Sequence, residues 1–150
     1  MSIQKYLYPP VYFLGGLGLI VLLHLFFPLG TIVPRYLSWL GAVLFVLGGV
    51  PAVLIFGQFQ RAGTTIHPHA VSQKLVTDGL FRFSRNPIYA GMALSLLGAA
   101  LYFGDLSPFV VAPLFVWVIQ NQFIVPEERL LEETFGDAYR EYKSHVRRWL

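Results

Sequence analysis

The sequence has 150 residues, of which 55% are hydrophobic and 13% are charged, and its net charge is +3. This balance is far from that of a soluble domain and is typical of an integral membrane protein, while the length fits one domain, 1–150. The chain contains no cysteine, which excludes disulfides and thiolate metal sites.

Four long stretches of the chain contain no Lys, Arg, Asp or Glu, namely 6–34, 36–60, 86–104 and 106–126. A helix that crosses a membrane needs about 20 mostly apolar residues. Four buried helices of a soluble bundle would each keep a polar face, and these stretches have none. We therefore predict an all-α integral membrane protein with four transmembrane helices, at about 8–28, 36–58, 87–104 and 107–125.

The basic residues predict the orientation of these spans. With four spans, the N-terminus, the middle loop and the C-terminus lie on one side of the membrane. Of the 11 Lys and Arg residues, all but Arg35 fall on that side. Because cytoplasmic loops carry an excess of Lys and Arg, both termini are predicted to be cytoplasmic.

Small and ionisable residues stand out in the first two spans. Glycines suit close approach of helices in lipid, and the first two spans contain Gly15, Gly16, Gly18, Gly41, Gly48 and Gly49. His24 is predicted to lie in the middle of the membrane, where an ionisable residue is a functional candidate. The alternative is a neutral histidine that is hydrogen-bonded to a neighbouring helix.

The middle loop, 58–85, is long for a connection between helices. It carries the apolar residues Ile66, Leu75, Val76, Leu80, Phe81 and Phe83. This composition predicts a folded cap over the cytoplasmic end of the bundle. His67 and His69 lie in the same loop, but two histidines without a third ligand are weak evidence for a metal. We expect no metal.

The stretch 75–91 combines turn signals, charge and a helix start. Asn86 is a favoured N-cap residue, and Pro87 fits the first helical position. A helix N-terminus carries partial positive charge, to which Arg85 adds a full one. Together they predict a binding site for a carboxylate or phosphate. The alternative is that Arg82 and Arg85 only mark the cytoplasmic end of a span.

The fourth span is predicted to end at Pro126, directly before Glu127 and Glu128. The segment 127–148 is predicted to be helical and amphipathic, and Gly136-Asp137 divides it into two short helices. Its apolar face is formed by Leu131, Phe135, Ala138, Tyr139, Tyr142 and Val146. Such a segment would lie on the membrane surface or pack over the middle loop.

Three motifs, LVTDGLFRFS (75–84), RNPIYAG (85–91) and PEERLLEETFGDAYREYKSHVRRW (126–149), resemble the isoprenylcysteine carboxyl methyltransferase family. More loosely, they resemble the membrane phospholipid methyltransferases. The resemblance covers about half of the chain. It implies an integral membrane enzyme that transfers a methyl group from S-adenosylmethionine without a Rossmann domain.

The same resemblance implies which residues form the site. The positions assigned to cofactor binding are Gln73, Lys74, Leu75, Val76, Phe81, Asn86, Pro87, Ile88, Tyr89 and Glu127. Arg85 and Glu128 are assigned to catalysis, with Glu128 supporting Glu127. The residues themselves suit this ligand. The helix start with Arg85 fits its carboxylate, the glutamates fit its ammonium, and Tyr89 or Phe81 fits its sulfonium through a cation–π contact.

Two positions depart from the family pattern. Eukaryotic members have a histidine where this chain has Asn86, so a ring nitrogen is not available there. They also carry an arginine one turn before the glutamate pair, associated with the prenyl-cysteine substrate. Phe123 takes that position here, and no Lys or Arg occurs between Arg85 and Arg129.

The leading functional hypothesis is a membrane methyltransferase that uses S-adenosylmethionine and acts on a lipophilic or small apolar acceptor, such as an isoprenylcysteine carboxylate or a phospholipid amine. Its expected partners are the lipid bilayer and that acceptor, and not nucleic acid. One alternative is a nicotinamide-dependent reductase of the sterol reductase type, with Arg61, Arg82 and Arg85 binding the extra phosphate. Another is a non-enzymatic helical membrane subunit.

The two polar motifs are predicted to meet. Arg85 and Asn86 are separated from Glu127 and Glu128 by one outward and one return span, which brings both pairs to the same membrane face. We expect them to line one pocket under the middle loop. Because unpaired carboxylates are costly at a membrane boundary, without a ligand the glutamates should pair with Arg82, Arg85 or Arg129, or contact water.

Overall fold

The computed structural model describes residues 8–61 and 75–150. The predictions made for Ile66, His67, His69, Gln73 and Lys74 therefore lie outside the described residues. The main helices are α1 (Pro9–Phe26), α2 (Ser38–Arg61), α3 (Pro87–Phe103), α4 (Val111–Ile119), α5 (Val125–Phe135) and α6 (Asp137–His145). Short helical turns connect them, namely η2 (Arg35–Leu37), η3 (Gly79–Arg82), η4 (Ser107–Val110) and η5 (Gln120–Ile124).

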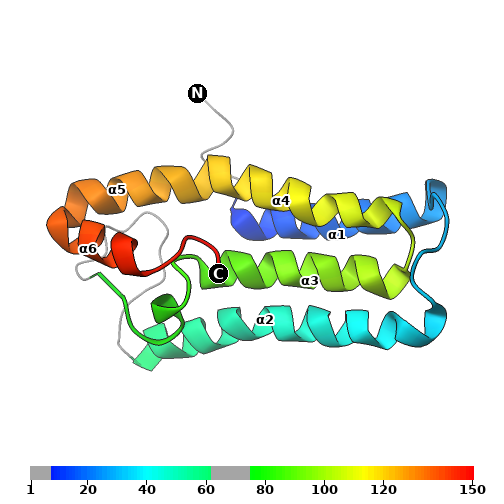
Figure 1. Cartoon of the computed structure of the whole chain (residues 1–150), viewed down its shortest axis with the longest axis horizontal. Helices are drawn as coiled ribbons and strands as arrows, with labels where there is room; N and C mark the ends of the chain where they lie inside the picture. The colour runs from blue at the N-terminus through cyan, green and yellow to red at the C-terminus, as the bar shows by residue number, and fades with distance from the viewer. Residues whose placement is uncertain (1–7, 62–74) are drawn as a thin grey trace.

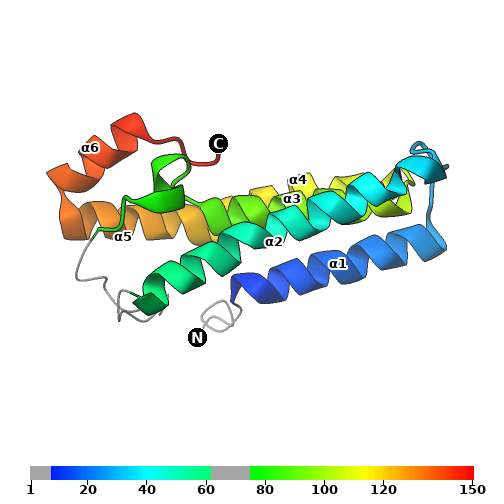
Figure 2. The same ribbon diagram turned by 90° about the horizontal axis from the view of Figure 1, so that it is seen from below.

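The long helices form an antiparallel bundle (Figures 1 and 2). Helix α3 contacts α1, α2 and α4, whereas the outer faces of α1 and α2 expose many large apolar side chains. Among the described residues, Pro9–Phe26, Arg35–Gly57 and Ser107–Phe135 are long and apolar enough to cross a membrane. Helix α3 is shorter, at 17 residues, and it packs among α1, α2 and α4. The predicted class, an all-α integral membrane protein, is confirmed.

Glycines bring α2 and α3 into backbone contact. A β-carbon at Gly41 or Gly48 of α2 would collide with the backbone of α3, and one at Gly91 or Gly98 of α3 would collide with the backbone of α2. Between these contacts, the Ser95 hydroxyl donates a hydrogen bond of 2.9 Å to the Phe45 carbonyl oxygen. Close approach and an interhelical hydrogen bond are the usual means of joining helices in lipid.

The prediction that glycines of the first two spans serve helix contact is therefore correct for part of the set. Gly41 and Gly48 lie in the α2–α3 contact, and Gly16 packs under the side chains of Leu96 and Val111. Gly15, Gly18 and Gly49 have no other group within contact distance of a β-carbon. The facing glycines of α3, Gly91 and Gly98, were not predicted, because the sequence alone does not show which surfaces of two helices meet.

His24, predicted to lie in the middle of the membrane, does not lie in the middle of its helix. His24 is in the last turn of α1, at the end of the bundle away from α6, where its Nδ1 contacts the Asp105 carboxylate. Thr31 also donates to Asp105, at 3.1 Å, and the Leu106 N–H donates to the Gly30 carbonyl oxygen. These contacts join the α1–α2 loop to the α3–α4 loop.

The helix of the predicted fourth span continues past Pro126. Helices α4 and α5 form one continuous helix through the π-helical turn η5, in which the Val125 N–H bonds the carbonyl of Gln120, five residues back (Figure 1). A proline ring clashes with the preceding turn of a regular helix, and the wider turn relieves that clash at Pro126. The predicted break after α5 is present, because Gly136 has a φ of 53° and α6 begins at Asp137.

Candidate active site

The two polar motifs meet at the end of the bundle that carries α6. Together they line a cavity of about 210 Å³. Its wall is formed by Leu75, Val76, Phe81, Arg85, Asn86, Glu127, Glu128, Leu131, Tyr139 and Tyr142. The long helices bring the chain back to one depth, and α6 folds back after Gly136 (Figure 2). Tyr139 and Tyr142 of α6 are part of the wall.

The structure thus places most, but not all, of the predicted site residues at this cavity. Pro87, Ile88 and Tyr89 are not in its wall. Three wall residues were missed, namely Leu131, Tyr139 and Tyr142. Their signal was present in the sequence, since all three belong to the predicted apolar face of the C-terminal segment. That face covers the pocket.

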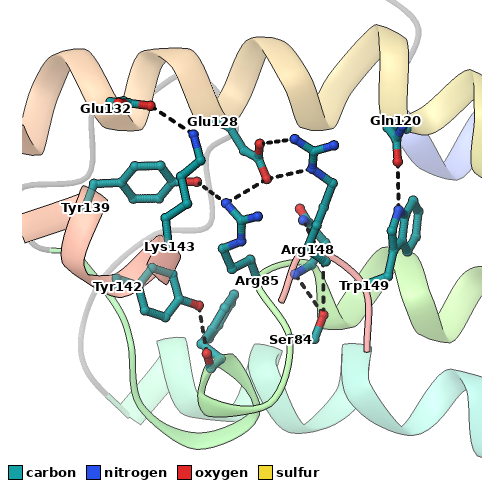
Figure 3. A network of polar contacts seen from close by, with 12 residues as sticks. Ser84, Arg85, Gln120, Glu128, Glu132, Tyr139, Tyr142, Lys143, Arg148 and Trp149 are labelled. Atoms are coloured by element: carbon teal, nitrogen blue, oxygen red, sulfur yellow. Dashed lines mark hydrogen bonds and ion pairs between the residues drawn. The ribbon is translucent and has the colours of Figure 1, made fainter. Parts of the chain in front are cut away.

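Glu128 is the centre of a charged network (Figure 3). Its side chain is 9% exposed and accepts two hydrogen bonds from Arg148, one from Nε at 3.0 Å and one from Nη2 at 2.8 Å. Arg85 Nη1 lies 3.1 Å from Oε1 of the same carboxylate. Of the partners expected for the glutamates, only Arg85 contacts Glu128, and Arg148 was not expected.

Arg85 is buried but poorly satisfied. Its side chain is 9% exposed, and its hydrogen bond to the Tyr139 hydroxyl is long, at 3.5 Å. Its Nε has no hydrogen-bond partner among the described residues. Buried guanidinium nitrogens usually have partners, so this atom is open to a further hydrogen-bond acceptor.

Asn86 does not cap α3 with its side chain, which corrects the sequence prediction. The helix begins at Pro87 as expected, but the Asn86 side chain makes no cap hydrogen bond. It donates instead to the carbonyl oxygen of Arg148, at 3.0 Å, and its own backbone N–H donates to the Ser84 hydroxyl, at 3.0 Å. Asn86 therefore ties the C-terminal residues to the start of α3.

Glu127 has a different partner from Glu128. The Tyr89 hydroxyl donates to its carboxylate, at 3.1 Å to Oε1 and 3.4 Å to Oε2. Glu127 thus lines the cavity with no ion-pair partner among the described residues, which corrects the expected arginine pairing. Of the two aromatic residues considered as contacts for the sulfonium, Tyr89 uses its hydroxyl to bind Glu127 and is not in the cavity wall. Phe81 is in the wall.

The tyrosines of α6 connect this helix to the middle loop. The Tyr142 hydroxyl donates to the Phe81 carbonyl oxygen at 2.7 Å, and Tyr139 is almost fully buried. Burial raises the pKa of Tyr139, and it raises the pKa of Tyr142 to about 12. Both hydroxyls therefore keep their protons at neutral pH and act as hydrogen-bond donors or acceptors.

The fold and the site define an integral membrane protein with a small pocket at one end of its bundle, in which a buried arginine and a carboxylate face apolar walls. The family profile described as phospholipid methyltransferase matches residues 36–138, which is more than half of the chain. The protein belongs to this family.

Relatives with assigned names agree with the resemblance found from the motifs. Protein-S-isoprenylcysteine O-methyltransferase of Schizosaccharomyces pombe is 31% identical over 104 residues, covering 62% of this chain and 44% of the relative. A probable enzyme of the same name from Oryza sativa subsp. indica is 30% identical over 113 residues, covering 74% and 59%. Methanethiol S-methyltransferase 1 of Bradyrhizobium diazoefficiens is 32% identical over 93 residues, covering 61% and 31%.

The matched regions span from about a third to somewhat over half of the length of these relatives. The likeness to the isoprenylcysteine methyltransferases is confirmed. The relatives are named for different methylated groups, an isoprenylcysteine in two cases and methanethiol in the third. Their names therefore do not point to a single acceptor.

Proposed function

We propose that this protein is a membrane methyltransferase that uses S-adenosylmethionine and acts on a lipophilic or small apolar acceptor. The observation that supports this most is the placement of a poorly satisfied cation, Arg85, and of Glu127, a carboxylate with no cationic partner among residues 8–61 and 75–150, in the wall of one cavity. S-adenosylmethionine carries a carboxylate and an ammonium. The residues present therefore fit this group.

Four residues at or beside the cavity have separate tasks in this proposal. Arg85 binds the carboxylate and Glu127 binds the ammonium, as charge-assisted hydrogen bonds are strong. Tyr89 holds the Glu127 carboxylate in place, and Phe81 packs near the adenine side. The bound cofactor supplies a methyl group on a positively charged sulfur.

The remaining contribution of the chain to catalysis is orientation and exclusion of water. An acceptor that is already a carboxylate, a thiolate or an unprotonated amine needs little acid–base help, so positioning supplies most of the rate. Tyr139 and Tyr142 close the pocket from α6, which limits the access of water. We place no proton transfer on any residue of the site.

The acceptor is proposed to be lipophilic or small and apolar. Relatives are named for an isoprenylcysteine group and for methanethiol, and these acceptors share apolar character more than size. Phe123, at the position of the family arginine, packs edge-on against Tyr12 with ring centroids 5.4 Å apart. Recognition of an acceptor carboxylate through a cation at that position is therefore not part of the proposal.

Ligand binding tests the proposal directly. In detergent, the purified protein should bind S-adenosylhomocysteine and not NADPH, as measured by isothermal titration calorimetry. Arg85→Ala should reduce the free energy of binding S-adenosylhomocysteine by more than it reduces the free energy of unfolding. Binding of NADPH alone would favour the reductase. Failure to bind either ligand would favour a non-enzymatic subunit.

Both termini are proposed to be cytoplasmic, so that the pocket opens toward the cytoplasmic cofactor. The start of α1 and the whole of α6 lie at the same end of the bundle (Figure 1). Reporter fusions at both ends of the chain should give cytoplasmic signals, and a reporter inserted after residue 30 should give an external signal as the control. An external signal from the C-terminal fusion would contradict the proposed side.

A further inference from the structure

The residues after α6 turn back into the site. The Arg85 N–H donates to the Arg147 carbonyl oxygen at 2.9 Å, next to the bond from Asn86 to the Arg148 carbonyl oxygen. The Trp149 indole N–H donates to the Gln120 side chain in η5, at 2.9 Å (Figure 3). These three bonds fix the backbone on either side of Arg148 between the start of α3 and the fourth span.

The two arginines hold Glu128 unequally. Arg148 makes a bidentate pair with both carboxylate oxygens, and such pairs combine strength with a fixed geometry. Arg85 approaches Oε1 to 3.1 Å as an ion pair only, without hydrogen-bond geometry. Oε1 also accepts a hydrogen bond from Arg148 Nε, at 3.0 Å. Arg148 is therefore the main partner of this carboxylate, and Arg85 is the secondary one.

The charges of this cluster do not cancel. The three groups in contact, two guanidiniums and one carboxylate, carry one net positive charge, while the second carboxylate of the wall, Glu127, contacts Tyr89 instead. Arg85 is the more buried cation, at 9% exposed against 35% for Arg148. Its Nε lacks a partner among the described residues. A buried charge without full compensation is costly, so this arrangement favours an incoming anion whose shape fits a guanidinium, such as a carboxylate.

We propose that Arg148 is a positioning residue for this ligand carboxylate. By taking Glu128 in a bidentate pair, Arg148 limits the glutamate to a single ion-pair contact with Arg85 and so keeps part of the positive charge of Arg85 available to the ligand. Without the Arg148 side chain, Glu128 is free to pair fully with Arg85. The inference rests on the proposed function, because the ligand carboxylate is that of the cofactor.

Two ligands and one variant test the inference. S-adenosylhomocysteine is compared with its decarboxylated analogue, which lacks only the carboxylate, by calorimetry in detergent. Arg148→Gln should lower the affinity for S-adenosylhomocysteine about tenfold, the scale of one charge-assisted hydrogen bond, and change that for the analogue by less than about twofold. Arg147→Gln is the matched control, because it removes the same charge from an exposed neighbour and should leave both affinities unchanged.

A double variant separates the effect of Arg148 on the pairing between Glu128 and Arg85 from a general loss of structure. In Arg148→Gln/Glu128→Gln the glutamate no longer competes for Arg85, so the affinity for S-adenosylhomocysteine should recover toward that of the parent. This variant also loses both partners of the pair, which is milder for folding than losing one. Circular dichroism and thermal unfolding check the fold of each variant.

Three outcomes would overturn the role of Arg148. These are equal losses for the two ligands, equal effects of Arg148→Gln and Arg147→Gln, and no recovery in a folded double variant. Failure of the proposed function looks different, because the parent protein itself would then not bind S-adenosylhomocysteine.

Discussion

Glu127→Gln should weaken binding of S-adenosylhomocysteine by about 1.5–3 kcal/mol, the usual scale for a hydrogen bond to a charged group. The substitution keeps the shape of the side chain and removes its charge. The amide oxygen of glutamine can still accept the hydrogen bond from Tyr89, so the local structure should survive. Isothermal titration calorimetry in detergent gives the change in binding free energy.

The control for this experiment lies on the same helix. Glu133 is exposed on α5, and Glu133→Gln removes an equal charge away from the pocket. It should leave the affinity unchanged. If Glu127→Gln binds S-adenosylhomocysteine as tightly as the parent protein, then Glu127 serves only as a partner for Tyr89 and the methyltransferase proposal loses its main support.

Gly98→Ala should destabilise the bundle by about 3 kcal/mol or more, at the upper end of the cost of overpacking a core. The new methyl group would lie 2.5 Å from the Phe45 backbone nitrogen and 2.7 Å from the Gly41 carbonyl oxygen. These are backbone atoms of α2 and cannot rotate away, so the two helices must separate. Thermal unfolding in detergent, followed by circular dichroism, measures the effect.

Gly49→Ala is the matched control for this substitution. Gly49 lies in the same helix pair, on α2, but a β-carbon there meets no other atom within 4 Å. Alanine is a better helix former than glycine by up to about 1 kcal/mol, so this variant should be as stable as the parent or slightly more stable. Equal destabilisation by both substitutions would contradict the backbone contact between α2 and α3.

The sequence predicts the membrane class and the convergence of the two motifs because both depend on regular quantities. The length of charge-free stretches locates the helices, and the regular rise of a helix returns Glu127 to the depth of Arg85. The break between α5 and α6 follows from Gly136, which adopts a positive φ. These features depend on local sequence and need no knowledge of packing.

The features that could not be predicted depend on which surfaces meet. Arg148 lies in a basic run that resembles a topology signal, and only the fold shows that it reaches Glu128. Asn86 has the composition of an N-cap, but its side chain bonds the Arg148 carbonyl oxygen, because the C-terminal residues return to that point. The contact of His24 with Asp105 likewise depends on the fold, because the two residues are 81 positions apart in the sequence.

The π-helical turn η5 changes the phase of the fourth span and thereby distinguishes its two neighbouring glutamates. Before the turn, the buried residues Val111, Phe115 and Ile119 recur every four positions; the next buried residues are Ile124 and Glu128. A regular α-helix, which rotates by about 100° per residue, would have continued this series through residues 123 and 127. The one extra residue in the turn therefore rotates Glu128 inward, as a counter-ion for Arg148, and leaves Glu127 at the wall of the cavity beside Tyr89. Two adjacent residues of the same type acquire different environments through a single irregular turn one helical turn away.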